Sequence, residues 1–239
     1  MMPIEYIDPR TIADVTLTER QMNITKKIVN ITSYIFNSKS LPVRITGFLL
    51  EGSYQTGKTE MIRQAIKRLR ETFKDLKFSF HDAAGIAMPN FGDSEKILAN
   101  IFVPPSTQSG TFHRVIVLDD IDCLFFGRDA NVSRSWHISL NSVLFHELDA
   151  MDPRMTIIMA TTNKPEIVDG ALRTRLFKIV VPEPSSDELL SIAKILIKKL
   201  DATPATSKEI LSLIQRRMKP GFGFRDIQQI IIEYIAESV

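Results

Sequence analysis

The sequence has little cysteine, no long apolar segment and almost no excess charge. Its 239 residues include one cysteine, Cys123. A single thiol cannot form an internal disulfide, which excludes a disulfide-stapled fold and agrees with a reducing compartment. Because Cys123 stands in an apolar stretch, it is expected to be a buried structural thiol.

Other absences narrow the class of protein further. No apolar run approaches the ~18–20 residues that span a bilayer, and the N-terminus lacks the pattern of a signal peptide. We therefore expect a soluble, cytoplasmic protein without membrane insertion. The four histidines show no metal-ligand spacing. A net charge of +2 does not argue for nucleic acid, and the basic clusters at 63–70 and 216–219 are typical of solvated helix faces. Nucleic-acid binding is not excluded.

Hydrophobic periodicity predicts an α/β fold. Apolar runs predict strands at 45–51, 76–81, 115–118, 156–160 and 177–181. Helical patterns lie before and between them, at 19–37, 58–73, 94–102 and 135–148. This alternation indicates a parallel sheet covered on both faces. After residue 182 only helical patterns remain, at 187–200, 207–218 and 224–237, which indicates a small helical lid.

The strongest motif is a complete G-x-x-x-x-G-K-T between a predicted strand and a predicted helix. Its backbone N–H groups would surround phosphate oxygens at a helix N-terminus. Lys58 would contact the β- and γ-phosphates, and the Thr59 hydroxyl would be a ligand of Mg²⁺. The predicted nucleotide-binding residues of this segment are Gly52, Ser53, Tyr54, Gln55, Thr56, Gly57, Lys58, Thr59 and Glu60.

A second motif follows about 60 residues later. The apolar run 115–118 ends in Asp119 and Asp120. A carboxylate at the end of a buried strand beside the phosphate-binding loop can hold Mg²⁺, and this role is assigned to Asp119. Asp120 is then positioned to orient the attacking water. ATP and Mg²⁺ are therefore the expected ligands.

Together these motifs resemble the AAA ATPase family over essentially the whole chain. The segment 11–15, with Asp14 and Val15, resembles the family's adenine-packing segment, and Phe91 before Gly-Asp-Ser-Glu resembles its pore aromatic. Asn163 resembles the sensor-1 residue that helps hold the attacking water. Arg173 and Arg175 stand in a segment similar to the one that carries arginine fingers, with a spacing nearer the katanin–spastin branch.

Two positions depart from the family pattern. The family's water-activating residue is usually glutamate, whereas this chain has Asp120. Its shorter side chain predicts slow hydrolysis, because small misplacements of a catalytic group cost up to ~10²-fold in rate. An Asp-Asp pair also stands in the second domain of N-ethylmaleimide-sensitive factor, which mainly binds ATP to hold its ring together. Arg225 resembles the sensor-2 arginine of other branches, and an exposed residue at a helix start is the equal alternative.

The resemblance implies strand order 5-1-4-3-2 and three regions: an N-terminal segment (1–42), the nucleotide-binding core (43–182) and the lid (183–239). It also implies an ATPase that works as a homo-oligomeric ring, a hexamer, with active sites at subunit interfaces, and that remodels or threads a macromolecule, first of all a protein. One alternative is an ATP-gated scaffold with negligible turnover. Another is a nucleic-acid-loading ATPase of the initiator or clamp-loader type.

Overall fold

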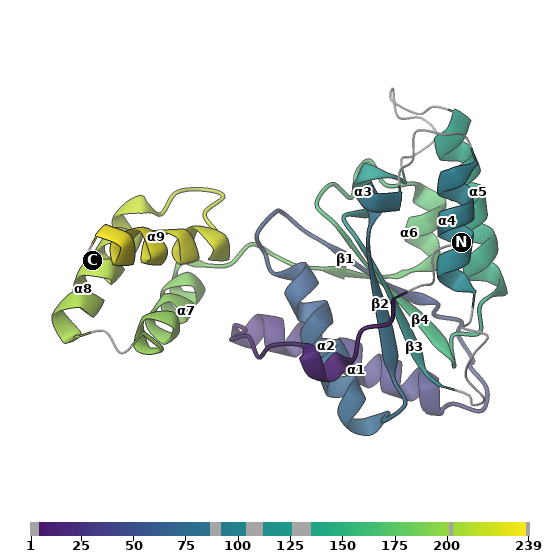
Figure 1. Ribbon diagram of the computed structural model, residues 1–239, viewed down its shortest axis with the longest axis horizontal. Coiled ribbons are helices and arrows are strands. Elements are labelled where there is room, and N and C mark those ends of the chain that lie inside the picture. The colour runs from purple at the N-terminus through teal and green to yellow at the C-terminus, as the bar shows by residue number, and fades with distance from the viewer. Residues whose placement is uncertain (1–4, 87–91, 104–111, 126–134, 201–202, 238–239) are drawn as a thin grey trace.

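The computed structural model describes residues 5–86, 92–103, 112–125, 135–200 and 203–237. Within them the chain forms an α/β core followed by a helical lid (Figure 1). In the figure the lid lies to the left of the core, and the connection between them is an extended segment.

The core is built on a five-stranded parallel sheet with strand order β2-β3-β4-β1-β5. This order confirms the expectation of 5-1-4-3-2. Because all strands run in one direction, their carboxyl ends meet at one edge of the sheet, where ligands bind in such folds. The strands are β1 (Gly47–Glu51), β2 (Lys77–Asp82), β3 (Arg114–Asp119), β4 (Thr156–Thr162) and β5 (Phe177–Val180).

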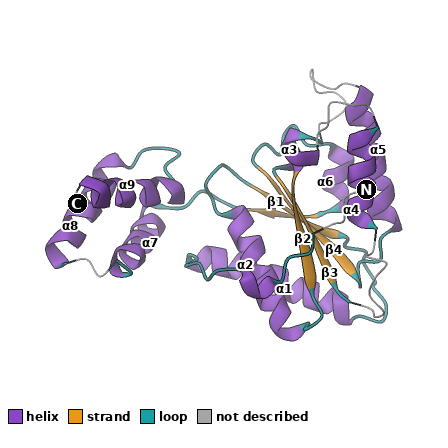
Figure 2. Ribbon diagram, viewed as in Figure 1, coloured by secondary structure: helices purple, strands orange, loops and turns teal. Residues whose placement is uncertain are grey.

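Helices cover both faces of the sheet (Figure 2). Helices α1 (Glu19–Asn37) and α2 (Lys58–Thr72) pack on one face. The other face is covered by α4 (Asp93–Phe102), α5 (Ser135–Ala150) and α6 (Gly170–Arg175). The short elements are η1 (Pro9–Thr11), α3 (Ala83–Ile86) and η2 (Ile121–Cys123). No helix in these described ranges is long and apolar enough to cross a membrane.

Alternation along β1 assigns its side chains to the two layers. Phe48 and Leu50 belong to the apolar cluster with α1 and α2, whereas Leu49 belongs to the cluster with α4, α5 and α6. Since successive strand residues point to opposite faces, Glu51 lies on the same face as Leu49. This places a carboxylate on the α6 side of the sheet, directly before Gly52.

The expectation of a buried cysteine is wrong. Cys123 is exposed, and its thiol donates a hydrogen bond to the backbone oxygen of Asp120 at 2.8 Å. It lies in the single turn η2, in which Ile121 is buried and Cys123 is exposed, and Leu124, which follows the turn, is buried as well. Of residues 121–124 only Cys123 is exposed, so the turn of the backbone, and not the apolar character of the stretch, decides that its thiol faces outward.

The lid has an apolar core of its own. It consists of α7 (Ser186–Lys198), α8 (Pro204–Arg217) and α9 (Phe224–Glu237), which pack through a separate cluster that includes Leu189, Ile210 and Ile227. A capping box between Ser185 and Glu188 begins α7. The helical lid expected from the sequence is thus confirmed. The boundaries 1–42, 43–182 and 183–239 stay a proposal, which the separate clusters support.

Candidate functional site

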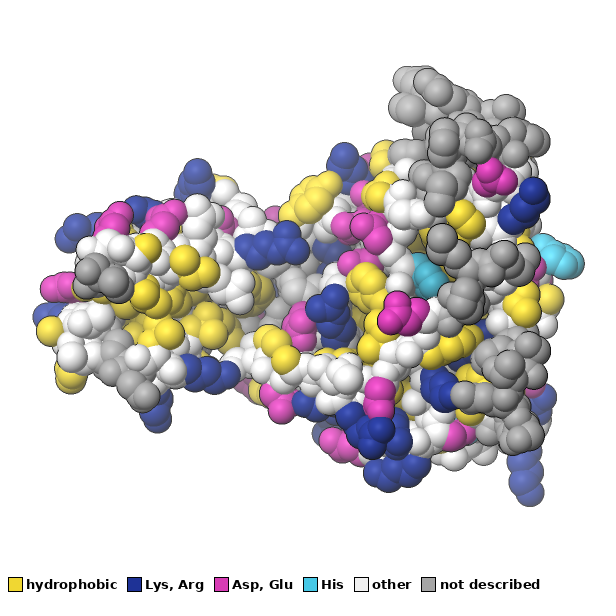
Figure 3. All heavy atoms as spheres, viewed as in Figure 1, with side chains coloured by type: hydrophobic (Ala, Val, Ile, Leu, Met, Phe, Trp, Pro, Cys, Tyr) yellow, Lys and Arg dark blue, Asp and Glu magenta, His cyan; other side chains and the backbone are white. Residues whose placement is uncertain are grey.

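A cavity of about 470 Å³ lies at the carboxyl edge of the sheet, between the core and the lid. Figure 3 shows the molecule narrowed between these two parts. Three regions line the cavity: the N-terminal segment, the core and the lid. The lining residues are Val15, Thr16, Leu17, Gln21, Tyr54, Gln55, Thr56, Gly57, Lys58, Thr59, Glu60, Arg63, Phe80, Asp119, Asp120, Asn163, Ile192, Leu196, Phe224, Arg225 and Gln228.

The loop between β1 and α2 forms one wall and follows a tight path. Gly57 has φ +83°, a conformation that glycine adopts without strain, and Gln55 has φ +62°. A Cβ at Gly52 would lie 2.3 Å from the backbone oxygen of Val181, so only glycine fits there. Gly57 is the N-cap of α2 and supplies no side-chain cap. The first N–H groups of α2 are therefore available to an anion in the cavity.

Lys58 lies at the centre of this loop. Its Nζ donates to the backbone oxygens of Gly52 and Ser53, each at 2.8 Å, and to Asn163 Oδ1 at 2.6 Å. Burial lowers the pKa of Lys58 below its ordinary value, and the charges of Asp120, Asp122 and Asp119 act in the opposite direction. The loop thus presents a held cation at the edge of the cavity.

Asp119, at the end of β3, faces the first turn of α2. The Thr59 hydroxyl donates to its Oδ1 and Oδ2 at 2.9 and 3.2 Å. The Thr161 hydroxyl of β4 donates to Asp119 Oδ1 at 2.6 Å and accepts the backbone N–H of Asp120 at 2.9 Å. The structure therefore brings together the two residues that the sequence assigns to Mg²⁺.

Asp120 and Asn163 form the neighbouring pair. Asn163 Nδ2 donates to Asp120 Oδ1 at 2.7 Å, so the Asn163 amide joins Asp120 to Lys58. Asp120 has a left-handed backbone, φ +53°. Burial raises the pKa of Asp120, as do the carboxylates of Asp119 and Asp122. A carboxylate whose pKa is raised is a better proton acceptor than an ordinary aspartate.

The two predicted arginine fingers do not line the cavity of their own chain. Arg173 is paired with Glu51, with Nε and Oε1 3.0 Å apart. Arg175 is paired with Asp149, with Nη2 and Oδ2 3.0 Å apart, and its guanidinium lies over the Phe145 ring. Each guanidinium is paired with a carboxylate of its own chain.

The remaining predicted residues divide into two groups. Val15 and Arg225 line the cavity, as do Tyr54, Thr56 and Glu60. Gly52, Ser53 and Asp14 do not belong to this lining.

The side chains of two residues outside the lining have partners elsewhere. Ser53 donates to Glu183 at 2.8 Å, and Asp14 accepts from Lys67 at 2.6 Å. Phe91, the predicted pore aromatic, lies outside the described residues.

Sequence reasoning missed three residues that organise the site. Thr161 holds Asp119, as described above, and Asp122 accepts from the Thr162 hydroxyl at 2.8 Å and from the backbone N–H of Asn163 at 3.0 Å. Gln21 of α1 donates to the backbone oxygen of Thr56 at 2.9 Å. Thr161 and Asp122 could have been predicted, because each is a polar residue at or just after the end of a buried strand. Gln21 could not, because its contact joins residues 35 positions apart.

The donor set at Asp119 fits Mg²⁺. Asp119 and Thr59 supply the hard oxygen ligands that this ion prefers. Three carboxylates, those of Asp119, Asp120 and Asp122, surround the single ammonium of Lys58, so a divalent cation would balance the charge. No group of three or more His, Cys, Asp or Glu side chains in the described part of the chain could hold a metal by itself.

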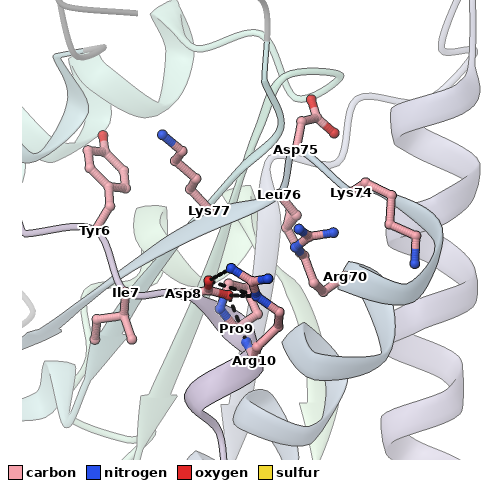
Figure 4. Close-up of a pocket in the computed structure, with 10 residues that line it drawn as sticks. All are labelled: Tyr6, Ile7, Asp8, Pro9, Arg10, Arg70, Lys74, Asp75, Leu76 and Lys77. Atoms are coloured by element: carbon pink, nitrogen blue, oxygen red, sulfur yellow. Dashed lines mark hydrogen bonds and ion pairs between the residues drawn. The ribbon is translucent and has the colours of Figure 1, made fainter.

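A second cavity, of about 280 Å³, lies at the β2 edge of the sheet (Figure 4). Ile7 forms an antiparallel bridge with Phe78 there. Arg10 is paired with Asp8, and Asp75 accepts from the backbone N–H of His113 at 3.1 Å. This cavity lacks a phosphate-binding loop, so we do not assign it to nucleotide. The labelled residues around it are Tyr6, Ile7, Asp8, Pro9, Arg10, Arg70, Lys74, Asp75, Leu76 and Lys77.

The sheet order, the loop between β1 and α2 and the acidic end of β3 define a P-loop nucleoside-triphosphatase fold. Residues 48–183 match the model of the "ATPase family associated with various cellular activities (AAA)". The chain belongs to this AAA family.

Curated relatives agree with this assignment. The chain is 29% identical over 197 residues to Cell division control protein 48 homolog C of Arabidopsis thaliana, an alignment over 81% of this chain and 23% of that protein. It is 28% identical over 190 residues to ATPase family gene 2 protein homolog B of Homo sapiens, over 70% and 24% of the two chains. The chain thus spans about a quarter of the length of these relatives.

Solved structures show the same fold. A chain of the E. coli MS115-1 HORMA:CdnC:Trip13 complex superposes with a TM-score of 0.72 at 16% identity, over 93% of this chain and 83% of that chain. The FIGL-1 AAA domain in complex with ADP superposes with a TM-score of 0.65 at 20% identity, over 91% and 70%.

Proposed function

We propose that this chain binds ATP with Mg²⁺ and hydrolyses it. The observation that carries the proposal is one connected network at the cavity: Thr59 contacts Asp119, and Asn163 joins Lys58 to Asp120. These contacts join three separate segments of the chain. Of the five residues named, all except Asn163 belong to one of the two sequence motifs.

Each residue has a distinct role in this proposal. The N–H groups at the start of α2 and the Lys58 ammonium bind the phosphates, since both present positive potential to the cavity. Thr59 and Asp119 would hold Mg²⁺, which supplies charge neutralisation to the phosphates when bound. Asp120 orients the attacking water and accepts its proton, while Asn163 positions Asp120 and contacts the same water. Val15 and the lid residues Ile192 and Leu196 offer apolar contacts to the base.

The arginines support a ring with shared sites. Neither Arg173 nor Arg175 lines the cavity of its own chain, which supports a role for a guanidinium of α6 at a neighbouring subunit's nucleotide. An arginine supplied in trans accelerates phosphoryl transfer by ~10³–10⁵ in other P-loop enzymes. We therefore propose a homo-oligomer, a hexameric ring in keeping with the family.

The lid connects nucleotide state to ring geometry in this proposal. Arg225 and Phe224 of α9 line the same cavity as Lys58. The linker 181–185 leaves β5 and enters α7, so rotation about it would change the cavity and the lid's outer surface together.

The proposed work of the ring is remodelling of a macromolecule, first of all a protein. Curated relatives include the "ATPase histone chaperone abo1" of Schizosaccharomyces pombe and the "Ribosome biogenesis ATPase RIX7" of Saccharomyces cerevisiae. Their names describe actions on macromolecular assemblies. The chain covers 16% and 22% of these two proteins, so the substrate stays a proposal.

The test is ATP turnover per subunit as a function of protein concentration, with Lys58→Ala and Arg175→Ala as variants. We expect turnover to rise with concentration and to fall at least ~10²-fold in either variant. Arg217→Ala, which removes a lid ion pair with Glu233, is the matched control and should leave turnover within about twofold. Turnover that ignores both concentration and the Arg175 change would refute the shared site.

A scaffold with negligible turnover is the second candidate. Asp120 has a shorter side chain than glutamate, and Asn163 already occupies one of its carboxylate oxygens. Under this candidate the wild-type chain binds ATP and assembles but hardly hydrolyses it, and Asp120→Glu raises turnover sharply. No gain in the variant would count against the scaffold.

A further inference from the structure

The two arginines of α6 have partners of very different kinds. Arg173 binds Glu51 with two contacts, Nε to Oε1 at 3.0 Å and Nη2 to Oε2 at 3.4 Å. The Glu51 side chain is only 7% exposed. Arg175 binds Asp149, whose side chain is 61% exposed. The two guanidinium-bearing side chains are equally exposed, at 32%, so the difference lies in the carboxylates.

Glu51 is directly connected to the phosphate-binding loop. It is the last residue of β1, and its backbone oxygen accepts from Val181 N at 2.7 Å. The next residue, Gly52, donates its N–H to Thr162 and accepts the Lys58 ammonium. Glu51 is thus a buried carboxylate fixed one residue before the loop that must receive a polyanion.

A buried carboxylate at this place needs a cation. Left unpaired, it would oppose phosphate binding electrostatically and would itself be costly to bury. Arg173 supplies that cation within the same chain. An exposed pair such as Arg175–Asp149 contributes little, because solvent screens it and both side chains can separate.

We infer that Arg173 acts in cis as a positioning residue, neutralising Glu51 beside its own phosphate-binding loop, and that Arg175 is the arginine of α6 that a neighbouring subunit uses. This inference rests on the proposed ATPase function. In it, Arg173 serves the nucleotide site of its own subunit, and Arg175 serves the site of the neighbouring subunit.

The first measurement is binding of ADP with Mg²⁺ to the full chain at concentrations where it is unassembled. ADP lacks the γ-phosphate, so an arginine that acts only on that group in trans should not affect its binding. We expect Arg173→Gln to weaken ADP binding roughly tenfold, the order of effect of one uncompensated charge a few residues away. The matched control is Arg154→Gln, which removes a surface pair with Asp152 and should leave the affinity unchanged.

The decisive variant is the double change Glu51→Gln/Arg173→Gln. It removes both charges and leaves no unpaired buried ion, so it stays interpretable even if Arg173→Gln does not fold. We expect it to bind ADP within about threefold of wild type and, when assembled, to retain ATP turnover, because its Arg175 is intact. Intact ADP binding with turnover reduced ~10²-fold or more would show that Arg173 acts in trans, and loss of ADP binding would refute the neutralising role.

Mixed oligomers supply an independent measurement. Subunits with Lys58→Ala lack a working loop but keep both arginines. Mixed with Arg175→Gln subunits, they should regain turnover. In such an oligomer the intact loop of an Arg175→Gln subunit can lie beside the intact Arg175 of a Lys58→Ala subunit. Mixed with Arg173→Gln subunits and assayed at ATP concentrations well below half-saturation, they should stay at about one-tenth of wild-type turnover or less, because the only intact lysine lies in a loop that binds nucleotide about tenfold more weakly. Recovery there would overturn the inference. If the wild-type chain binds no ADP at all, the proposed function itself fails, which is a separate result.

Discussion

His81 should make the stability of this protein depend on pH between about 4 and 6.5. It lies on β2 opposite Leu118 of β3, and its Nε2 atom is buried without a hydrogen-bond partner among the described residues. Burial lowers the pKa of His81 from 6.5 to about 4. The folded protein therefore keeps this imidazole neutral at pH values where the unfolded chain protonates it.

The direction and size of this pH effect on the free energy of unfolding follow from proton linkage. Between the two pKa values the unfolded state binds more protons, so the contribution of His81 is complete above pH 6.5 and is lost as pH falls toward 4. Within this window, each pH unit changes the free energy of unfolding by about 1.4 kcal/mol. From pH 7 to pH 5 the contribution of His81 to the free energy of unfolding falls by at most about 2 kcal/mol. Because solvent screens a partly exposed group, we expect about 1–2 kcal/mol.

The assay is urea unfolding at pH 7 and pH 5 for wild type and His81→Leu. Other titrating groups are common to both proteins, so their contributions cancel in the difference. We expect the variant to gain about 1–2 kcal/mol relative to wild type on going to pH 5. The exposed His146→Gln variant is the control and should follow wild type. A difference between wild type and His81→Leu that does not change with pH would refute the reasoning.

Three further changes test other features. Thr25→Val should raise the free energy of unfolding by about 1 kcal/mol in urea titrations, because the Thr25 hydroxyl is fully buried and has no partner in the described structure. Asn163→Ala should lower ATP turnover by ~10²–10³ while ADP affinity changes far less, since it removes the contact between the loop lysine and the second carboxylate. Gly223→Ala should weaken ADP binding severalfold, because the added Cβ would lie 2.6 Å from the Cβ of Gln55 and push the lid from the loop. Gly85→Ala, where nothing lies within 4 Å, should bind ADP normally, and equal affinities for the two glycine variants would contradict the lid contact.

Much of the fold followed from the sequence because its signals are local. The helix expected at 19–37 is α1 with the same bounds, and the strand expected at 177–181 is β5, Phe177–Val180. Periodicities of two and 3.6 residues reflect which side chains one element buries, so they can be read without knowing its neighbours. The strand order came from the family resemblance, since no local pattern specifies which strands pair.

Short elements were harder to predict. Periodicity predicted no separate helix at α6, which has six residues, and Cys123 was expected in the core although η2 turns it outward. In one or two turns of helix, contacts to the rest of the protein outweigh local propensity. The direction of a side chain in such a segment is therefore decided by tertiary packing.

The phosphate-binding loop was predictable from the sequence alone, because eight consecutive residues carry the motif and the flanking strand and helix follow from periodicity. The hydrogen-bond partners in the site depend on the folded chain: Asn163 contacts both Lys58, 105 positions away, and Asp120, 43 positions away. The tertiary structure also decided that Arg173, two residues from Arg175, binds a buried glutamate while its neighbour binds an exposed aspartate. Ion pairs and hydrogen bonds act over a few ångströms, and only strand register and helix placement bring distant residues within that distance.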